Sequence, residues 1–271
     1  MEAVKKVLIL YHSRAGSTRT IAEIYKEKLT SYSVKISPIN LEYDYEKLIN
    51  FDFLIFAFPT YHCSPSKAMM EFVQKIPVFE NPKKAFTFTT YGLYSGNTLR
   101  EFIKLCSSKN LCICGYSAYR SPAADGTLLL PGLPFMYTFK KRIAVKLRKD
   151  INKVENIVNR NNVTAQIPRF KFYSILNYPN KALGKKYKHK IYLQKDKCVK
   201  CNKCIDECIR KCWSINAGYP EFNGDNCEFC FKCIHHCPRE AILLSSKTIR
   251  KKKLNEKFYH DYKQEIINKL I

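Results

Sequence analysis

The stretch "KVLILYHSRAGSTRTIA", residues 6–22, joins an apolar run to a polar, glycine-containing loop. Residues 6–11 are almost continuously apolar and include β-branched side chains, which predicts a buried strand. The loop carries Ser13, Gly16 and Ser17, and a helical pattern follows over 18–29. A strand, a short loop and a helix in this order are typical of the first unit of a parallel α/β sheet.

The same alternation continues downstream. We expect further buried strands at 52–58, 85–90 and 111–116, and a weaker strand at 33–36. Helical periodicity lies between them at 66–76 and 97–109. Because parallel strands need crossover connections, the pattern predicts a doubly wound α/β domain with five parallel strands and helices on both faces.

The rest of the chain divides by composition. Prolines and glycines at 118–135 predict a loop, and 137–158 predicts a long, basic, amphipathic helix. We expect the polar connector, with aromatic patches at Phe170, Phe172 and Tyr173, to pack between two domains. The last segment reads as an amphipathic packing helix rather than a membrane anchor. The expected segments are 1–158, 159–190, 191–246 and 247–271.

Charge is unevenly distributed. The net charge is +24, and residues 140–190 carry 15 basic and two acidic residues. This segment could attract an acidic protein partner, contact an anionic membrane surface, or simply form a solvated face, and the sequence does not decide among the three. It contains no known nucleic-acid-binding motif, so no nucleic acid is expected. Without an apolar run of membrane-spanning length or a signal peptide at the first ten residues, we expect a cytoplasmic protein. The oligomeric state stays open.

Cysteines form the strongest motif. Of thirteen cysteines, eight fall in two runs, 198–208 and 227–237, and each run has the spacing C-x2-C-x2-C-x3-C. Clustered thiols of this kind are typical of metal ligands in a reducing compartment. We interpret the remaining five as buried small hydrophobic residues: Cys63, Cys106, Cys112, Cys114 and Cys212.

The two runs, with 18 residues between them, resemble the bacterial-type dicluster ferredoxins, a small α+β domain, over about 191–246. In that family the fourth cysteine of each run binds the cluster of the other run. Structural zinc would instead use two C-x2-C pairs separated by a longer loop. Ile209 departs from the proline usual at that position. The resemblance implies two 4Fe-4S clusters, one held by Cys198, Cys201, Cys204 and Cys237, and the other by Cys227, Cys230, Cys233 and Cys208.

Three loops follow predicted strands, at 12–18, 59–65 and 90–97. In parallel sheets, ligands bind beyond the carboxyl ends of the strands. The loops resemble those of the flavodoxin family over about 4–150, which implies FMN as cofactor. Ala15 replaces a common threonine and Arg14 a usually small residue, and a shell without flavin is the alternative. The implied FMN-binding residues are Ser13, Arg14, Ala15, Gly16, Ser17, Thr18, Pro59, Thr60, Tyr61, Tyr91, Gly92 and Gly96.

The sequence predicts no catalytic role for the histidines near these motifs. His12 next to Ser13 does not predict a base and nucleophile, because neighbouring side chains at a strand end point apart. His62 lies in the second loop and is a candidate contact to a flavin edge. His235 and His236 lie inside the second cysteine run, where we expect them to face solvent.

A flavodoxin-like domain followed by a dicluster ferredoxin resembles the flavodoxin/ferredoxin fusion proteins of anaerobes. This resemblance implies electron transfer between two 4Fe-4S clusters and FMN, as a carrier or as the electron-input subunit of an anaerobic reductase. The expected partner is a redox protein with an acidic docking surface. Two alternatives remain: an FMN-dependent oxidoreductase acting directly on a small substrate, and an iron-sulfur redox sensor with a basic binding surface. No residue is predicted to be catalytic.

Overall fold

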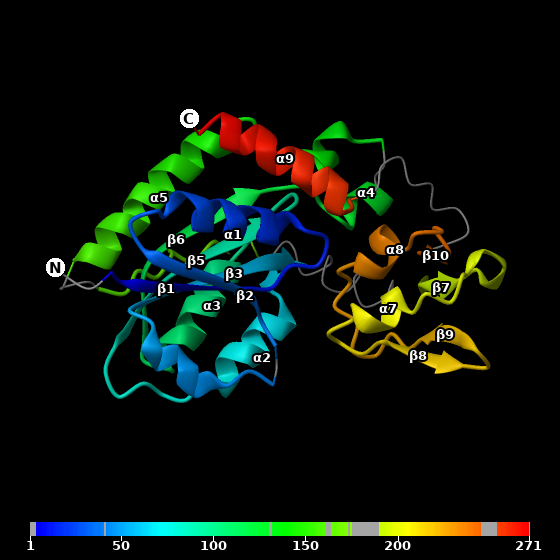
Figure 1. Ribbon diagram of the computed structural model, residues 1–271, viewed down its shortest axis with the longest axis horizontal. Coiled ribbons are helices and arrows are strands. Elements are labelled where there is room, and N and C mark those ends of the chain that lie inside the picture. The colour runs from blue at the N-terminus through cyan, green and yellow to red at the C-terminus, as the bar shows by residue number, and fades with distance from the viewer. Residues whose placement is uncertain are drawn as a thin grey trace.

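The computed structural model describes residues 4–40, 42–129, 132–160, 164–172, 174, 190–244 and 254–270. Figure 1 shows two parts side by side. The larger is an α/β part, residues 4–160, built on one central sheet. The smaller is a cysteine module, residues 190–244. The last helix returns from the module to the α/β part.

The sheet has five parallel strands in the order β2-β1-β3-β5-β6. A two-residue strand, β4 (Ser64–Pro65), adds to β3 in antiparallel fashion. The parallel strands agree with the prediction, and β3, β5 and β6 extend further than predicted. This order is that of the flavodoxin type, whose ligand site lies where the strand order reverses. The five strands are β1 (Lys6–Tyr11), β2 (Ser33–Pro38), β3 (Phe53–Tyr61), β5 (Lys83–Tyr91) and β6 (Leu111–Arg120).

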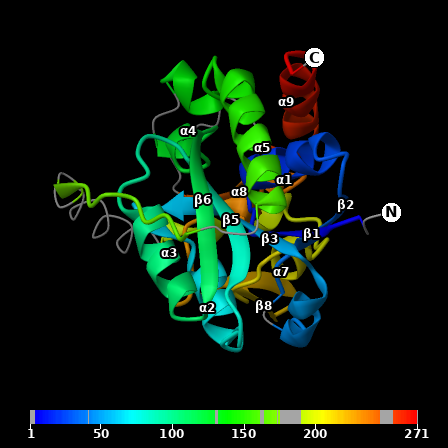
Figure 2. The ribbon, with the colours of Figure 1, turned by 90° about the vertical axis from the view of Figure 1, so that its left-hand side faces the viewer.

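Helices cover both faces of the sheet (Figure 2). Because successive side chains of a strand point to opposite faces, Val7 and Ile9 enter one hydrophobic core while Leu8 and Leu10 enter the other. The first core is covered by α1 (Ser17–Lys28), α5 (Ile143–Asn159) and α9 (Glu256–Asn268). The second core is covered by α2 (Lys67–Lys75), α3 (Thr98–Ser107) and the 3-10 helix η1 (Tyr45–Asn50).

The segment after β6 differs from the prediction. The expected loop contains the short helix α4 (Gly126–Leu129) and begins the 3-10 helix η2 (Pro134–Tyr137). The long helix starts at Ile143 rather than at residue 137. Phe139 is buried in the core, and the Lys140 N–H donates to the Arg120 carbonyl over 3.3 Å. Residues 138–140 therefore lie along the end of β6 and do not form the first turn of the helix.

The described part of the connector lies against the α/β part rather than between the two parts. The Gln166 N–H donates to the Ile113 carbonyl of β6 over 2.8 Å. The Asn97 side chain accepts from the Lys171 N–H over 2.9 Å and donates to the Lys171 carbonyl over 3.2 Å. Tyr173 and most of the connector lie outside the described residues.

The C-terminal helix α9 is a packing element, as predicted. Phe258 and Ile266 are buried in the same core as α1 and α5. Lys263 bridges two carboxylates of α1, Glu23 at 3.1 Å and Glu27 at 2.6 Å. In the described ranges, no helix combines the length and the apolarity needed to cross a bilayer.

The cysteine module is small and mixed. Two antiparallel strand pairs, β7 (Tyr192–Leu193) with β10 (Ile242–Leu243) and β8 (Trp213–Asn216) with β9 (Tyr219–Phe222), frame it. Its core contains Trp213, Phe231 and Ile234, and Leu128 of α4 joins it from the α/β part. The two parts therefore share buried apolar surface. Its helical turns are η5 (Lys195–Lys197), α7 (Lys203–Asp206) and α8 (Lys232–His236).

Candidate functional site

A cavity, here called the loop cavity, opens at the carboxyl ends of β1, β3 and β5. It is lined by 13–18, 59–62, 90–92, 121–125 and Phe229. All the predicted FMN-binding residues line it except Gly96. Gly96 packs against Cys63, whose Cβ atom would lie 3.1 Å from a Cβ atom added at Gly96. The loop 121–125, which follows β6, was not among the predicted FMN-binding residues. Phe229 comes from the cysteine module.

The first loop of this cavity leads directly into α1. Gly16 precedes the helix with φ +128°, a conformation that only glycine adopts without strain. The Ser17 hydroxyl contacts the Pro122 carbonyl at 3.3 Å and the Tyr259 hydroxyl at 3.0 Å, and the Thr18 hydroxyl contacts that of Thr90 at 2.8 Å. The Ser13 hydroxyl oxygen is buried and has no hydrogen-bond partner among the described residues.

The second and third loops form the opposite wall. The hydroxyls of Thr60 and Thr89 form a hydrogen bond with 2.8 Å between their oxygen atoms. His62 and Cys63 both have positive φ, 47° and 61°, which marks a strained turn of the kind found at binding sites. A Cβ atom at Gly92 would lie 2.5 Å from the Cβ atom of Ala123, so glycine permits the two loops to meet.

Arg14, which the flavodoxin resemblance assigns to FMN, also contacts the cysteine module. Its guanidinium donates to the Glu207 carbonyl of the cysteine module over 2.8 Å, and the side chain is buried. Arg14 lines the loop cavity and also the second cysteine cavity described below. A buried cation thus lies between the two.

The cysteine module contains two cavities. The first cysteine cavity is lined by the predicted set Cys198, Cys201, Cys204 and Cys237. The second cysteine cavity is lined by Cys208, Cys227, Cys230 and Cys233. Cys204 and Cys233 line both cavities, so the two spaces adjoin. No group of three or more His, Cys, Asp or Glu side chains in the described ranges is arranged to hold one metal ion.

The backbone repeats the cysteine motif. Lys200 and Asn202 have φ near +55° in the first run, and Phe229 and Phe231 have φ of 57° and 53° at the equivalent positions of the second run. Backbone N–H groups at or directly after left-handed residues point toward the sulfurs; Lys211 and Glu240, with φ of 50° and 55°, precede two of them. Four such donors contact cysteine Sγ atoms at 3.2 to 3.4 Å: Lys200 to Cys198, Cys212 to Cys208, Phe229 to Cys227, and Ala241 to Cys237.

Cys212 is buried, as predicted, but it also lines the second cysteine cavity. Its thiol is a hydrogen-bond partner of both Cys208 and Cys227. The hydrogen bond with Cys212 is the main cause that lowers the pKa of Cys208 to about 6. The hydrogen bond between Cys212 and Cys227 likewise lowers the pKa of Cys227. Cys63, Cys106 and Cys114 are buried as well, whereas Cys112 is half-buried.

The prediction that His235 and His236 face solvent is wrong. His235 is buried, and its Nε2 atom lies 3.0 Å from the Ala124 carbonyl of the α/β part. His236 pairs with Glu207, with 3.0 Å between Nδ1 and Oε2. His235 is buried because the α/β part covers this side of the second cysteine run, whereas His236 is half-buried. The sequence of the run alone contains no signal of that docking.

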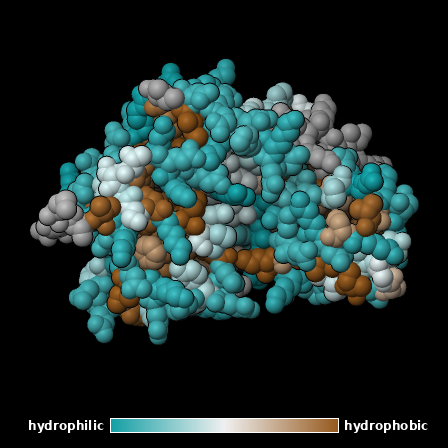
Figure 3. Space-filling view, viewed as in Figure 1, coloured by the Kyte–Doolittle hydropathy of each residue, from teal (hydrophilic) through white to brown (hydrophobic). Residues whose placement is uncertain are grey.

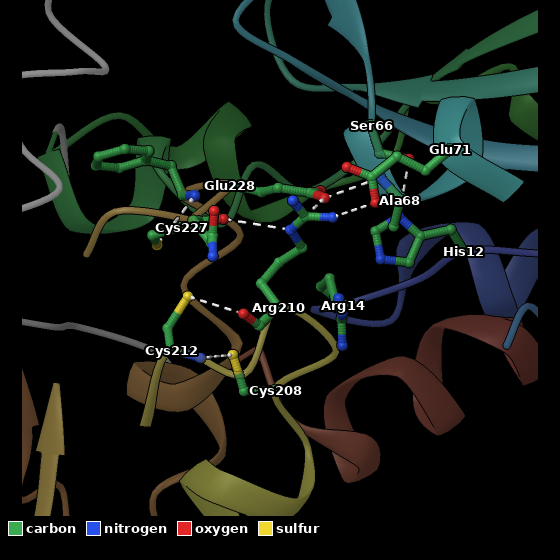
Figure 4. A network of polar contacts seen from close by, with 12 residues as sticks. His12, Arg14, Ser66, Ala68, Glu71, Cys208, Arg210, Cys212, Cys227 and Glu228 are labelled. Carbon is green, nitrogen blue, oxygen red and sulfur yellow. Dashed lines mark hydrogen bonds and ion pairs between the residues drawn. The ribbon is translucent and has the colours of Figure 1, made fainter. Parts of the chain in front are cut away.

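A polar network fixes the second cysteine run on the α/β part (Figure 4). Arg210 contacts Glu71 of α2 at 2.5 Å and Glu228 at 3.6 Å. Glu228, between Cys227 and Phe229, accepts from the Ala68 N–H at the start of α2 over 2.9 Å. A carboxylate is favourable at a helix N-terminus, so this contact orients the run. As a result, Phe229 meets His62 edge to face with 5.6 Å between ring centroids.

The hydrogen bond between Tyr259 and Ser17 leads to a first prediction. Tyr259→Phe removes the hydroxyl that holds the first loop to α9, and we expect a loss of about 0.5–1.5 kcal/mol in the free energy of unfolding. Urea denaturation measures it. Tyr262→Phe on the same helix is the control, since no hydrogen bond of Tyr262 is found in the described ranges. Equal midpoints for the two variants would contradict the prediction.

Comparisons with known proteins agree with this geometry for the α/β part. A family described as flavodoxin domain matches residues 8–106, and no curated protein matches the chain. An archaeal flavodoxin is similar at 17% identity and TM-score 0.40, covering 56% of this chain and 98% of that one. Flavodoxin 1 from Bacillus cereus has 12% identity and TM-score 0.41, covering 58% and 100%. A flavoprotein in complex with FMN from Lactobacillus acidophilus has 14% identity and TM-score 0.32, covering 42% and 93%. The family match, over residues 8–106, makes the α/β part flavodoxin-like.

Proposed function

We propose that this chain is an electron-transfer protein that holds FMN in the loop cavity and two 4Fe-4S clusters in the two cysteine cavities. When bound, the clusters would exchange single electrons and FMN one or two. The protein would act as a carrier or as the electron-input subunit of an anaerobic reductase. The segment boundaries 1–158 for the flavin domain and 191–246 for the ferredoxin-type domain belong to the same proposal.

The loop cavity fits the phosphate of FMN. The first N–H groups of a helix lack intrahelical acceptors and attract anions, and α1 begins at this cavity. The hydroxyls of Ser17 and Thr18 are already bonded within the protein. The phosphate would therefore be held by backbone N–H groups of the loop and by the buried, unpartnered hydroxyl of Ser13. Thr60, Tyr61, Tyr91 and Gly92 would line the ring.

The donor sets of the cysteine cavities fit two clusters. Each cavity is lined by the four thiols that the swapped arrangement requires. Backbone N–H groups that donate to the cysteine sulfurs stabilise negative charge there and raise the reduction potential of a bound cluster. Trp213 lines the second cavity and closes it on the side of the module's core.

A single observation carries the proposal: Phe229, which lies between Cys227 and Cys230, forms part of the wall of the loop cavity. Arg14 lines both cavities. The proposed sites for FMN and for the second cluster therefore share side chains, and the first cysteine cavity adjoins the second. The arrangement supports a linear route from the first cysteine cavity, through the second, to the flavin.

The proposal is tested by the kinetics of internal electron transfer. Anoxic protein is mixed with a limiting amount of titanium(III) citrate in a stopped-flow instrument, and the cluster and flavin absorption bands are followed together. Because the sites adjoin, we expect redistribution of electrons at a rate independent of protein concentration. A flavin reduction rate proportional to protein concentration would show exchange between molecules and contradict the proposal.

The buried guanidinium of Arg14 gives a second prediction. A nearby positive charge stabilises the reduced cluster, so Arg14→Gln lowers the midpoint potential of the cluster at Cys208, on the order of 50 mV. Arg14→Lys restores most of it. Potentiometric titration followed by electron spin resonance measures the shift. Arg19→Gln is the control, because Arg19 pairs with Glu23 and does not line the cavity. Equal shifts at both positions refute the assignment.

An external redox partner has access at the first cysteine cavity. Cys201 is exposed there, and exposed Val199, Lys200 and Lys203 surround it. An apolar centre with cations beside it suits an acidic electron-transfer protein. We expect the second-order rate of electron exchange with an acidic ferredoxin to fall roughly tenfold as sodium chloride is raised, since salt screens steering. A rate unaffected by salt would count against this partner.

A further inference from the structure

A second hollow, here called the cleft, lies on the other side of the first loop from the loop cavity. It is bounded by the first loop and the start of α1, by the end of β2, by the cysteine module and by α9. Figure 3 shows this face hollowed between the two parts, with mainly hydrophilic side chains around the hollow. Nothing in the proposed electron route uses it.

Several polar groups that line the cleft have no protein partner among the described residues. His12 is buried, its Nδ1 atom contacts the Ser66 hydroxyl at 2.8 Å, and its Nε2 atom is unpartnered. His236, from the cysteine module, has a buried Nε2 atom without a partner as well. Arg14 uses one guanidinium nitrogen for the Glu207 carbonyl, which leaves its other N–H groups available. Buried polar atoms of this kind normally have a hydrogen-bond partner.

The charges of the cleft favour an anion. Four cations line it, and three of them are paired with carboxylates: Arg19 with Glu23, Lys263 with Glu23 and Glu27, and Lys232 with Glu207. Arg14 is the exception, because its guanidinium contacts a backbone carbonyl and no carboxylate among the described residues. Burial, followed by the charges of Arg14 and Lys232, lowers the pKa of His12, so this imidazole is neutral. If the Ser66 hydroxyl donates to Nδ1 of His12, the Nε2 atom carries the ring proton and is a donor. Such a neutral donor beside the buried Arg14 guanidinium suits an oxyanion, which accepts hydrogen bonds and balances the positive charge.

We propose that the cleft binds the phosphate or carboxylate group of a small molecule, held by the Nε2–H group of His12 and by the N–H groups of Arg14 that do not contact Glu207. The cysteine module completes the site, because the Glu207 carbonyl holds the Arg14 guanidinium and His236 lines the cleft. The first loop lies between this site and the FMN site: residues 13–16 line both cavities, whereas His12 and His260 line only the cleft.

The test is isothermal titration calorimetry of anoxic protein loaded with FMN and clusters, with inorganic phosphate, succinate and neutral glycerol as probes. Loading with FMN keeps the probes out of the loop cavity. We expect saturable binding of at least one anion and none of glycerol. His12→Asn retains an amide near the Nδ1 position but removes Nε2, and should weaken binding tenfold or more. His12→Gln, whose amide reaches the Nε2 position, should restore it.

Two surface variants keep the proposal testable if the His12 variants fail to fold. His260→Glu places a negative charge at the cleft, and Gln264→Glu places the same charge elsewhere on α9. We expect several-fold weaker binding for the first and no change for the second. Absence of saturable binding of either anion, or binding unaffected by both His12→Asn and His260→Glu, would overturn the proposal. FMN content, measured separately, tests the proposed function and not this site.

Discussion

Replacing Cys208 with alanine is expected to remove one cluster and leave the other, so that iron falls from about eight to about four atoms per chain. Cys208 is the last cysteine of the first run, yet it lines the cavity of the second run. The surviving signal in electron spin resonance should therefore be that of the cluster at Cys198, Cys201 and Cys204. Internal electron transfer to FMN should become very slow, because the cluster next to Phe229 is lost.

Cys212→Ala is the matched control for this prediction. Cys212 is buried in the same cavity, and its backbone N–H donates to the Cys208 sulfur over 3.4 Å. We expect this variant to retain about eight iron atoms, with only a shift in potential. The double variant excludes replacement of one thiol by the other. If Cys212→Ala lost the cluster and Cys208→Ala kept it, the ligand assignment would be reversed.

Gly16→Ala is expected to lower the free energy of unfolding by about 2–4 kcal/mol. Gly16 has φ +128°, and a Cβ atom there would lie 2.2 Å from Cδ2 of the buried Tyr259 ring. Neither the backbone nor the ring has room to adjust, since Tyr259 is also hydrogen-bonded to Ser17. The loop must therefore move, and FMN affinity should fall with stability. Urea denaturation and fluorescence titration of FMN measure the two effects.

Gly132→Ala provides the comparison, because no heavy atom lies within 4 Å of its added Cβ. We expect an unchanged urea midpoint and unchanged FMN affinity. The double variant Gly16→Ala/Tyr259→Ala removes the steric overlap but leaves a cavity in the core. It should lose less stability than the sum of the two single changes. A Gly16→Ala protein as stable as the wild type would show that α9 does not press on the loop.

The sheet could be predicted because its strands are buried on both faces. Residues such as Val7 and Leu8 enter opposite cores, so the strands read as continuous apolar runs with a local signal. The two thiol sets stay a prediction that rests on the ferredoxin resemblance of the repeated cysteine spacing. The structure brings each predicted set to one cavity and repeats the left-handed residues at equivalent positions, Lys200 with Phe229.

The docking of the two parts could not be predicted from sequence. Arg14 contacts Glu207, 193 positions away, and neither residue belongs to a periodic pattern that indicates this partner. For the same reason Phe229 was not expected in the loop cavity, and His235 was expected at the surface. The loop 121–125 had a usable signal that was not applied: it follows a parallel strand and therefore lies at the same sheet edge as the other loops.

The central claim is that two thiol-bound clusters and one flavin share this chain. It is tested most directly by the iron, acid-labile sulfide and FMN content of protein purified without oxygen, read together with its electron spin resonance spectrum. The account predicts about eight iron, eight sulfide and one FMN per chain, with interacting signals from two reduced clusters. Zinc without sulfide, or a colourless preparation lacking both iron and flavin, would contradict it.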